Sequence, residues 1–198
     1  MNKEFITIAV DVQNDFCQGG SLAVPFGDEV VPVINRLTAQ TRENKGTVIF
    51  TRDWHPAQTS HFYNWPVHCV KETNGASFHP DLEIYESDLI VSKGTAKDED
   101  GYSGFDGQTV AGQTINEIIT SKAENASEVV VQIGGLATDY CVKATVLDAL
   151  KLKKKLGKKL SVIAITNAVK AVNVNENDGS QALAQMHQAG AELLEFKD

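Results

Sequence analysis

The feature that most constrains this fold is a regular alternation of short apolar runs and helix-like segments along the chain. Six runs are rich in apolar and β-branched residues: Phe5–Val10, Thr47–Thr51, Leu89–Ser92, Val129–Ile133, Leu160–Thr166 and Glu192–Phe196. Most are continuously apolar rather than alternating, which is typical of strands buried on both faces. Such strands in alternation with helices predict a parallel sheet, because each crossover returns the chain to the same edge.

Four segments with helical patterning lie between these strands: Asp28–Thr41, Thr109–Ser121, Thr138–Lys155 and Asn177–Gln188. Asp28 is a candidate N-cap, and Gly157 is a candidate for the residue that ends the third helix. With 198 residues, the chain is long enough for one sizeable core. We therefore expect a single α/β domain over residues 1–198, with a doubly wound, mostly parallel six-stranded sheet and helices on both faces.

Composition excludes several classes of partner. The net charge of −8 argues against nucleic acid and against an anionic membrane surface. The basic run 151–159 lies where a helix should end, where cations suit the helix dipole. The three cysteines show no paired spacing, and we find neither a signal peptide nor an apolar run that could span a bilayer. We expect a soluble cytoplasmic protein.

A cluster of potential metal ligands occupies one short stretch: Asp53, His55, His61 and His68. Asp53 and His55 are two residues apart at a strand end, so their side chains point to the same side. One carboxylate and three imidazoles can close around a single divalent ion, and the set suits several first-row metals. The alternative is that these histidines are solvated loop residues.

Reactive side chains also follow the carboxyl ends of successive predicted strands: Asp11, Asp53, Lys93 and Cys141. Ligands bind at this edge of an open parallel sheet. Cys141 stands in a glycine-containing turn at the start of a helix, where backbone amides would lower the thiol pKa and could hold an oxyanion. A lone buried cysteine is more often a small hydrophobe, but the joint placement favours chemistry. The chain has no dinucleotide-binding fingerprint after its first strand, no phosphate-binding loop and no Gly-x-Ser-x-Gly motif.

Together, several motifs resemble the nicotinamidase/pyrazinamidase family of isochorismatase-like cysteine hydrolases. They are DVQNDF (11–16), TRDWHP (51–56), WPVHCV (65–70), the Lys93–Gly94 step, YSGF (102–105) and GGLATDYCV (134–142). The metal-ligand pattern is the more specific part, because it separates nicotinamidases from metal-free relatives. The resemblance implies a metal-dependent amidase that hydrolyses nicotinamide, and also pyrazinamide, through a thioester and serves NAD salvage.

The resemblance also implies roles for individual residues. Cys141 matches the nucleophile, Asp11 the general base and acid, and Lys93 the third member of the triad. The amides of Ala137 and Cys141 match an oxyanion hole that a cis bond after Leu136 would shape. The metal ligands would be Asp53, His55, His61 and His68. The resemblance implies one divalent ion, zinc in the first place, with iron or manganese as alternatives. Positions lining the pyridine pocket are Phe16, Trp65, Tyr102, Leu136 and Tyr140.

Two departures from the family pattern concern the pocket. Tyr140 stands where some relatives carry histidine, and the loop Thr95–Gly101 is acidic and slightly long. Alternative functions are an amidase for ureido compounds, a non-catalytic metal-binding module and a flavodoxin-like electron carrier. A homo-oligomer is compatible with the resemblance, which implies a small-molecule substrate and neither a nucleic-acid nor a membrane partner.

Overall fold

One parallel sheet organises the protein. The computed structural model describes residues 2–197. Its strands are β1 Lys3–Val10, β2 Thr47–Asp53, β3 Leu89–Lys93, β4 Glu128–Leu136, β5 Leu160–Lys170 and β6 Glu192–Leu194. They pair in parallel in the order β3-β2-β1-β4-β5-β6. The prediction of six strands in a doubly wound sheet is confirmed, and the topology switches direction between β1 and β4, where such folds bind ligands.

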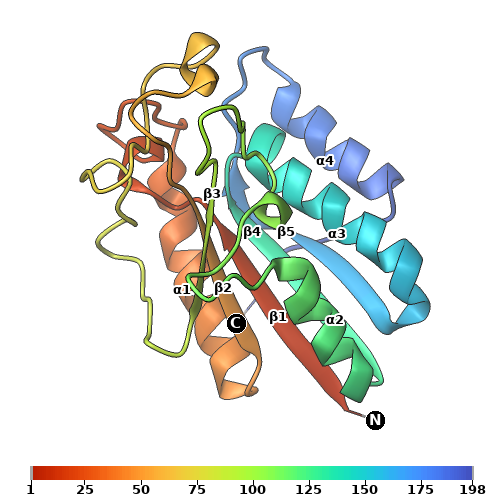
Figure 1. Cartoon of the computed structure of the whole chain (residues 1–198). Coiled ribbons are helices and arrows are strands. Elements are labelled where there is room, and N and C mark those ends of the chain that lie inside the picture. The colour runs from red at the N-terminus through yellow and green to blue at the C-terminus, as the bar shows by residue number, and fades with distance from the viewer. Residues whose placement is uncertain (1, 198) are drawn as a thin grey trace.

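Helices cover both faces of this sheet (Figure 1). They are α1 Val31–Glu43, α2 Ile115–Asn125, α3 Lys143–Leu156 and α4 Asp178–Gln188. The helix α1 packs on one face with the segments that follow β1 and β2. The other three helices contribute to the core on the opposite face, where Ile115, Ile118 and Ile119 of α2 are buried together. Within the described chain, no helix is long and apolar enough to cross a membrane.

Two predicted helix starts are wrong. Asp28 is not an N-cap: it lies in the 3-10 turn Gly27–Val30, its carboxylate accepts the N–H of Gln18, and α1 begins only at Val31. The second helix begins at Ile115 rather than Thr109, because Thr114 and Glu117 form a reciprocal capping box there. Residues 109–113 form a turn instead.

The remaining predicted helix ends agree more closely with the structure. The third helix starts as a π-helical turn, Thr138–Val142, before α3. Gly157 does end it, with a positive φ of 66°. The last strand is shorter than predicted and stops at Leu194, after which the backbone of Phe196 bonds to the side chain of Asn167.

Candidate active site

Four buried side chains meet at the carboxyl edge of the sheet. Asp11 follows β1, Asp53 ends β2, Lys93 ends β3, and Cys141 lies in the turn that follows β4. The ammonium group of Lys93 lies 2.7 Å from Asp11 Oδ2, 2.5 Å from Asp53 Oδ1 and 3.6 Å from Cys141 Sγ. Lys93 Nζ also donates a hydrogen bond to the carbonyl oxygen of Gly101 at 2.7 Å. The structure therefore brings together the three residues that the resemblance assigns to chemistry.

Asp11 is held by Thr51 of β2 on one side and has β4 close to it on the other. Its backbone N–H donates to Thr51 O at 3.2 Å, and the Thr51 hydroxyl donates to Asp11 Oδ1 at 2.6 Å. On the other side, β4 approaches β1 so closely that a Cβ on Gly135 would lie 2.0 Å from the carbonyl oxygen of Val10. Only glycine permits this approach, which places the chain leading to Cys141 beside Asp11.

Burial dominates the titration of the reacting groups. It raises the pKa of Asp11 to about 6, against the opposing effect of Lys93 and with a further contribution from Asp53. Burial also raises the pKa of the Cys141 thiol well above its ordinary value, and the neighbouring carboxylates add to this. The expectation that a helix N-terminus lowers the Cys141 pKa is therefore wrong. The thiol is protonated at neutral pH, so a nucleophilic thiolate needs a base beside it, and Asp11 is within 4.8 Å.

Lys93 keeps its charge in this buried site. Burial alone would lower the pKa of Lys93, but the carboxylates of Asp11 and Asp53 raise it well above its usual range. Burial likewise opposes ionisation of Asp53, yet Lys93 and His55 hold the pKa of this carboxyl well below its usual range. The result is one ammonium between two carboxylates of unequal acidity, of which Asp11 is the one able to exchange a proton near neutrality.

Three imidazoles converge beside this triad. Ring nitrogens of His55, His61 and His68 lie within 4.8 Å of one another, and all three side chains are buried. Asp53 Oδ2 lies 3.7 Å from His55 Nε2 and 3.8 Å from His68 Nε2. The other oxygen of Asp53 is engaged by Lys93, so this residue links the two clusters.

The outer nitrogens of these rings fit a metal site. Each Nδ1 faces an oxygen acceptor: Gly94 O at 3.0 Å from His55, Asp100 Oδ1 at 2.9 Å from His61 and Pro66 O at 2.7 Å from His68. Because these oxygens require a proton on Nδ1, each Nε2 keeps a free lone pair. His55 Nε2 is buried and has no hydrogen-bond partner among the described residues. An orphaned lone pair within a set of three imidazoles is what a divalent cation of the zinc class would satisfy.

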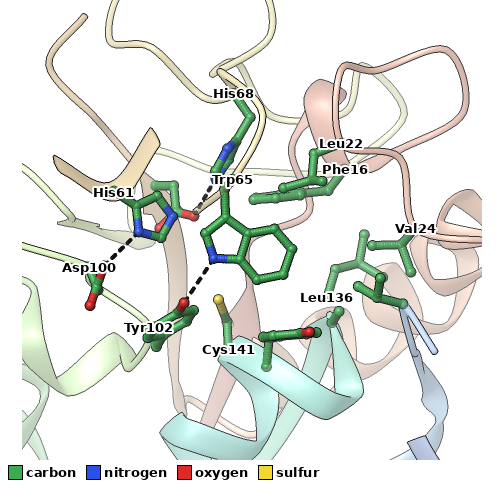
Figure 2. Close-up of a pocket in the computed structure, with 14 residues that line it drawn as sticks. Phe16, Leu22, Val24, His61, Trp65, His68, Asp100, Tyr102, Leu136 and Cys141 are labelled. Carbon is green, nitrogen blue, oxygen red and sulfur yellow. Dashed lines mark hydrogen bonds and ion pairs between the residues drawn. The ribbon is translucent and has the colours of Figure 1, made fainter. Parts of the chain in front are cut away.

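A pocket joins the two clusters (Figure 2). The five predicted pocket residues all line it: Phe16, Trp65, Tyr102, Leu136 and Tyr140. His61 and His68 border one part of the pocket, and the sulfur of Cys141 points into another (Figure 2). The Trp65 indole N–H donates to the Tyr102 hydroxyl at 2.9 Å. This shape suits a small planar ring with an amide on one side and a metal-binding atom on another.

Sequence reasoning missed several residues that support the site. Asp100, whose carboxylate faces His61 Nδ1, comes from the acidic loop 95–101. Gln13, part of the quoted DVQNDF motif, is buried, and its side-chain amide binds the backbone N–H and C=O of Asp53 at 2.7 and 2.9 Å. The carboxylate of Asp139 accepts the N–H groups of Val172 and Asn173, tying the pocket wall to the turn before Cys141. For Gln13 and Asp139 the available signal was a polar side chain inside a quoted motif, whereas Asp100 is exposed and lies outside the motifs.

The sequence and the fold of this chain are similar to those of known proteins. The isochorismatase domain family matches residues 6–198. The nicotinamidase of Escherichia coli (strain K12) is 37% identical, over 96% of this chain and 94% of its own length. The crystal structure of the pyrazinamidase of Pyrococcus horikoshii in complex with zinc has a TM-score of 0.83 and 36% identity, over 98% of this chain and 99% of that one. A protein of L. infantum in complex with nicotinate has a TM-score of 0.80 and 29% identity, covering 97% and 92% of the two chains.

Proposed function

The chain belongs to the isochorismatase family, among its nicotinamidase-like hydrolases of amide C–N bonds, and from this premise we propose that it converts nicotinamide to nicotinate and ammonia. One observation carries the proposal. One pocket is lined by the Cys141 thiol, which lies within 4.8 Å of the Asp11 carboxylate, and elsewhere by His61 and His68 of the three-imidazole cluster. Nicotinamide presents an amide carbon and a ring nitrogen to these two groups. Pyrazinamide has the same two features and is proposed as a second substrate.

The first half of the reaction forms a thioester. Asp11, mostly ionised at neutral pH with a pKa of about 6, takes the proton of Cys141 Sγ, and the thiolate attacks the amide carbon. The backbone amides of Ala137 and Cys141 stabilise the resulting oxyanion. Protonated Asp11 then gives its proton to the amide nitrogen, the C–N bond breaks and ammonia leaves.

The second half returns the enzyme to its resting state. Ionised Asp11 takes a proton from water, and the hydroxide formed attacks the thioester carbon. The C–S bond breaks, the thiolate recovers its proton from Asp11, and nicotinate is released. Throughout both halves, the charge of Lys93, 2.7 Å from Asp11 Oδ2, keeps this carboxylate in place and offsets its negative charge.

We further propose that Asp53, His55, His61 and His68 hold one divalent ion, with zinc preferred and iron or manganese as alternatives. When bound, the ion would orient the substrate through the pyridine nitrogen, which is the template role of a metal rather than water activation. The ring would lie between Phe16 and Trp65. The three unpaired cysteines suit a reducing cytoplasm, where the product would enter NAD salvage.

Release of ammonia from nicotinamide by the purified, metal-loaded protein tests this proposal. The comparison substrate is a ureido compound, the class used by the alternative amidase. We expect turnover of nicotinamide and little turnover of the ureido compound. Turnover of nicotinamide should be lost once a chelator has stripped the metal and has itself been removed. Preference for the ureido compound would assign the protein to the other amidase class.

A further inference from the structure

A second cluster of metal-ligating groups lies outside the pocket. Cys17 Sγ, a carboxylate oxygen of Asp28 and a ring nitrogen of His79 all lie within 4.8 Å of one another. Three separate segments supply them: the loop after β1, the turn Gly27–Val30 and the chain before β3. The N–H of His79 donates to Val12 O at 2.9 Å, which anchors its segment to that loop. The described residues that line the pocket and those that line the cleft beside Cys17 do not overlap.

The Asp28 carboxylate is the common acceptor of this cluster. It accepts the backbone N–H of Gln18 at 3.2 and 3.1 Å, and His79 Nε2 lies 3.3 Å from its Oδ1. Burial and the neighbouring carboxylate raise the pKa of the Cys17 thiol to about 12. The metal-free cluster is thus a protonated thiol and an imidazole N–H, both directed at one carboxylate. A cation in the same place would have three ligands already gathered around it.

We propose that Cys17, Asp28 and His79 form a second binding site for a divalent ion of the zinc class, distinct from the three-histidine cluster. Thiolate, imidazole and carboxylate are the donors that Zn²⁺ and Co²⁺ take in proteins, and a site with three protein ligands leaves the fourth position to water. Binding would join the segment that carries Phe16, next to Cys17, to two other segments of the fold.

Metal binding requires Cys17 Sγ and His79 Nε2 to give up their protons. The Cys17 thiol releases its proton to solvent, and the His79 proton moves from Nε2 to Nδ1 so that Nε2 can bind the ion. In the metal-free structure, Nδ1 accepts a hydrogen bond from the backbone N–H of Asp81 at 3.2 Å. When Nδ1 carries the proton, this N–H would donate to water instead, since Asp81 is exposed. The carboxylate keeps its bond from Gln18, because one carboxylate has about four acceptor positions. The polar cleft lined by all three ligands provides an entry path.

Cobalt substitution tests this site independently of amidase activity. Apoprotein is titrated with Co²⁺, and bound metal and the near-ultraviolet thiolate-to-cobalt charge-transfer absorption are recorded together. The proposed ligands of the three-histidine centre include no sulfur, so the charge-transfer band reports the second site. We expect two equivalents of Co²⁺ with the band in the wild type, and one equivalent without the band in Cys17→Ser.

Matched variants make the test specific. Cys69→Ser removes another buried thiol and Cys141→Ser removes the thiol of the pocket, and both should keep two equivalents and the band. His79→Gln should lose the second equivalent while retaining Cys17, and it carries the test if Cys17→Ser fails to fold. A wild type that binds one equivalent without the band, or a band that persists in folded Cys17→Ser, would overturn the proposal.

Discussion

Between pH 7 and pH 5, we expect kcat/KM for nicotinamide to fall about tenfold, because Asp11 must be ionised to accept the Cys141 proton. Burial raises the pKa of Asp11 to about 6, so roughly nine-tenths of this carboxyl is ionised at pH 7 and roughly one-tenth at pH 5. An aspartate at its ordinary pKa of 3.8 would remain about nine-tenths ionised at pH 5, and the rate would scarcely change. The two cases differ enough for initial rates of ammonia release to separate them.

A single substitution should move this acid limb. The Thr51 hydroxyl donates to Asp11 Oδ1 at 2.6 Å and so favours the ionised carboxylate. A hydrogen bond to a charged group contributes about 1.5–3 kcal/mol, which corresponds to about 1–2 pH units. Thr51→Val should therefore shift the midpoint of the limb upward by about one unit. Thr41→Val is the matched control, because its buried hydroxyl contacts Thr7 and the backbone of α1 instead.

Metal content has to be measured at each pH, because protonation of histidine ligands would also reduce activity. The profile is interpreted only over the range in which the metal content is constant. A rate that stays level from pH 7 to pH 5 in that range would refute a rate-limiting Asp11 with a pKa of about 6. A midpoint that is the same in Thr51→Val and in the wild type would refute the proposed contribution of the hydroxyl.

Three further predictions concern the lysine, the metal and the substrate. Lys93→Met leaves two buried carboxylates without their cation and should lower the free energy of unfolding by about 3–5 kcal/mol. Urea denaturation measures this, and a variant as stable as the wild type would contradict it. His55→Ala should lose metal and turnover together. Asp100→Asn keeps an oxygen acceptor for His61 and should retain the metal. A full metal content in His55→Ala, measured by elemental analysis, would argue against the proposed ligand set. Benzamide lacks the ring nitrogen, so its kcat/KM should be lower than that of nicotinamide on the order of 10²–10³-fold, while pyrazinamide remains a substrate. Equal values for benzamide and nicotinamide would remove the orienting role of the metal.

Much of the fold and of the site could be predicted from the apolar runs and from the residues that follow them. Apolar runs located all six strands, and those of the inner strands are nearly continuous because strands buried on both faces leave few polar positions; β6 is short and has no buried residue. Parallel pairing then requires the residues after β1, β2, β3 and β4 to lie at one edge, which is where Asp11, Lys93 and Cys141 meet. One miss was avoidable: Thr114 and Glu117 have the spacing of a capping box and mark the true start of α2.

Other features depend on the folded structure and have no signature in the sequence. The carbonyl oxygens of Gly94 and Pro66 that face the histidine rings belong to the backbone, so residue types do not reveal them. The direction of the Cys141 pKa shift depends on how deeply the thiol is buried and on its distance from two carboxylates. Local position at a helix N-terminus favoured the opposite direction, and burial outweighs it.

The most direct test of the central claim is the amount of nicotinate and ammonia formed from nicotinamide by the wild type and by Cys141→Ala, with both proteins matched for metal content. The wild type should form the two products in equal amounts. Cys141→Ala should form neither above background while its metal content is unchanged, because the nucleophile is lost and the histidine cluster is intact. Substantial product from the metal-matched variant would contradict hydrolysis through a Cys141 thioester.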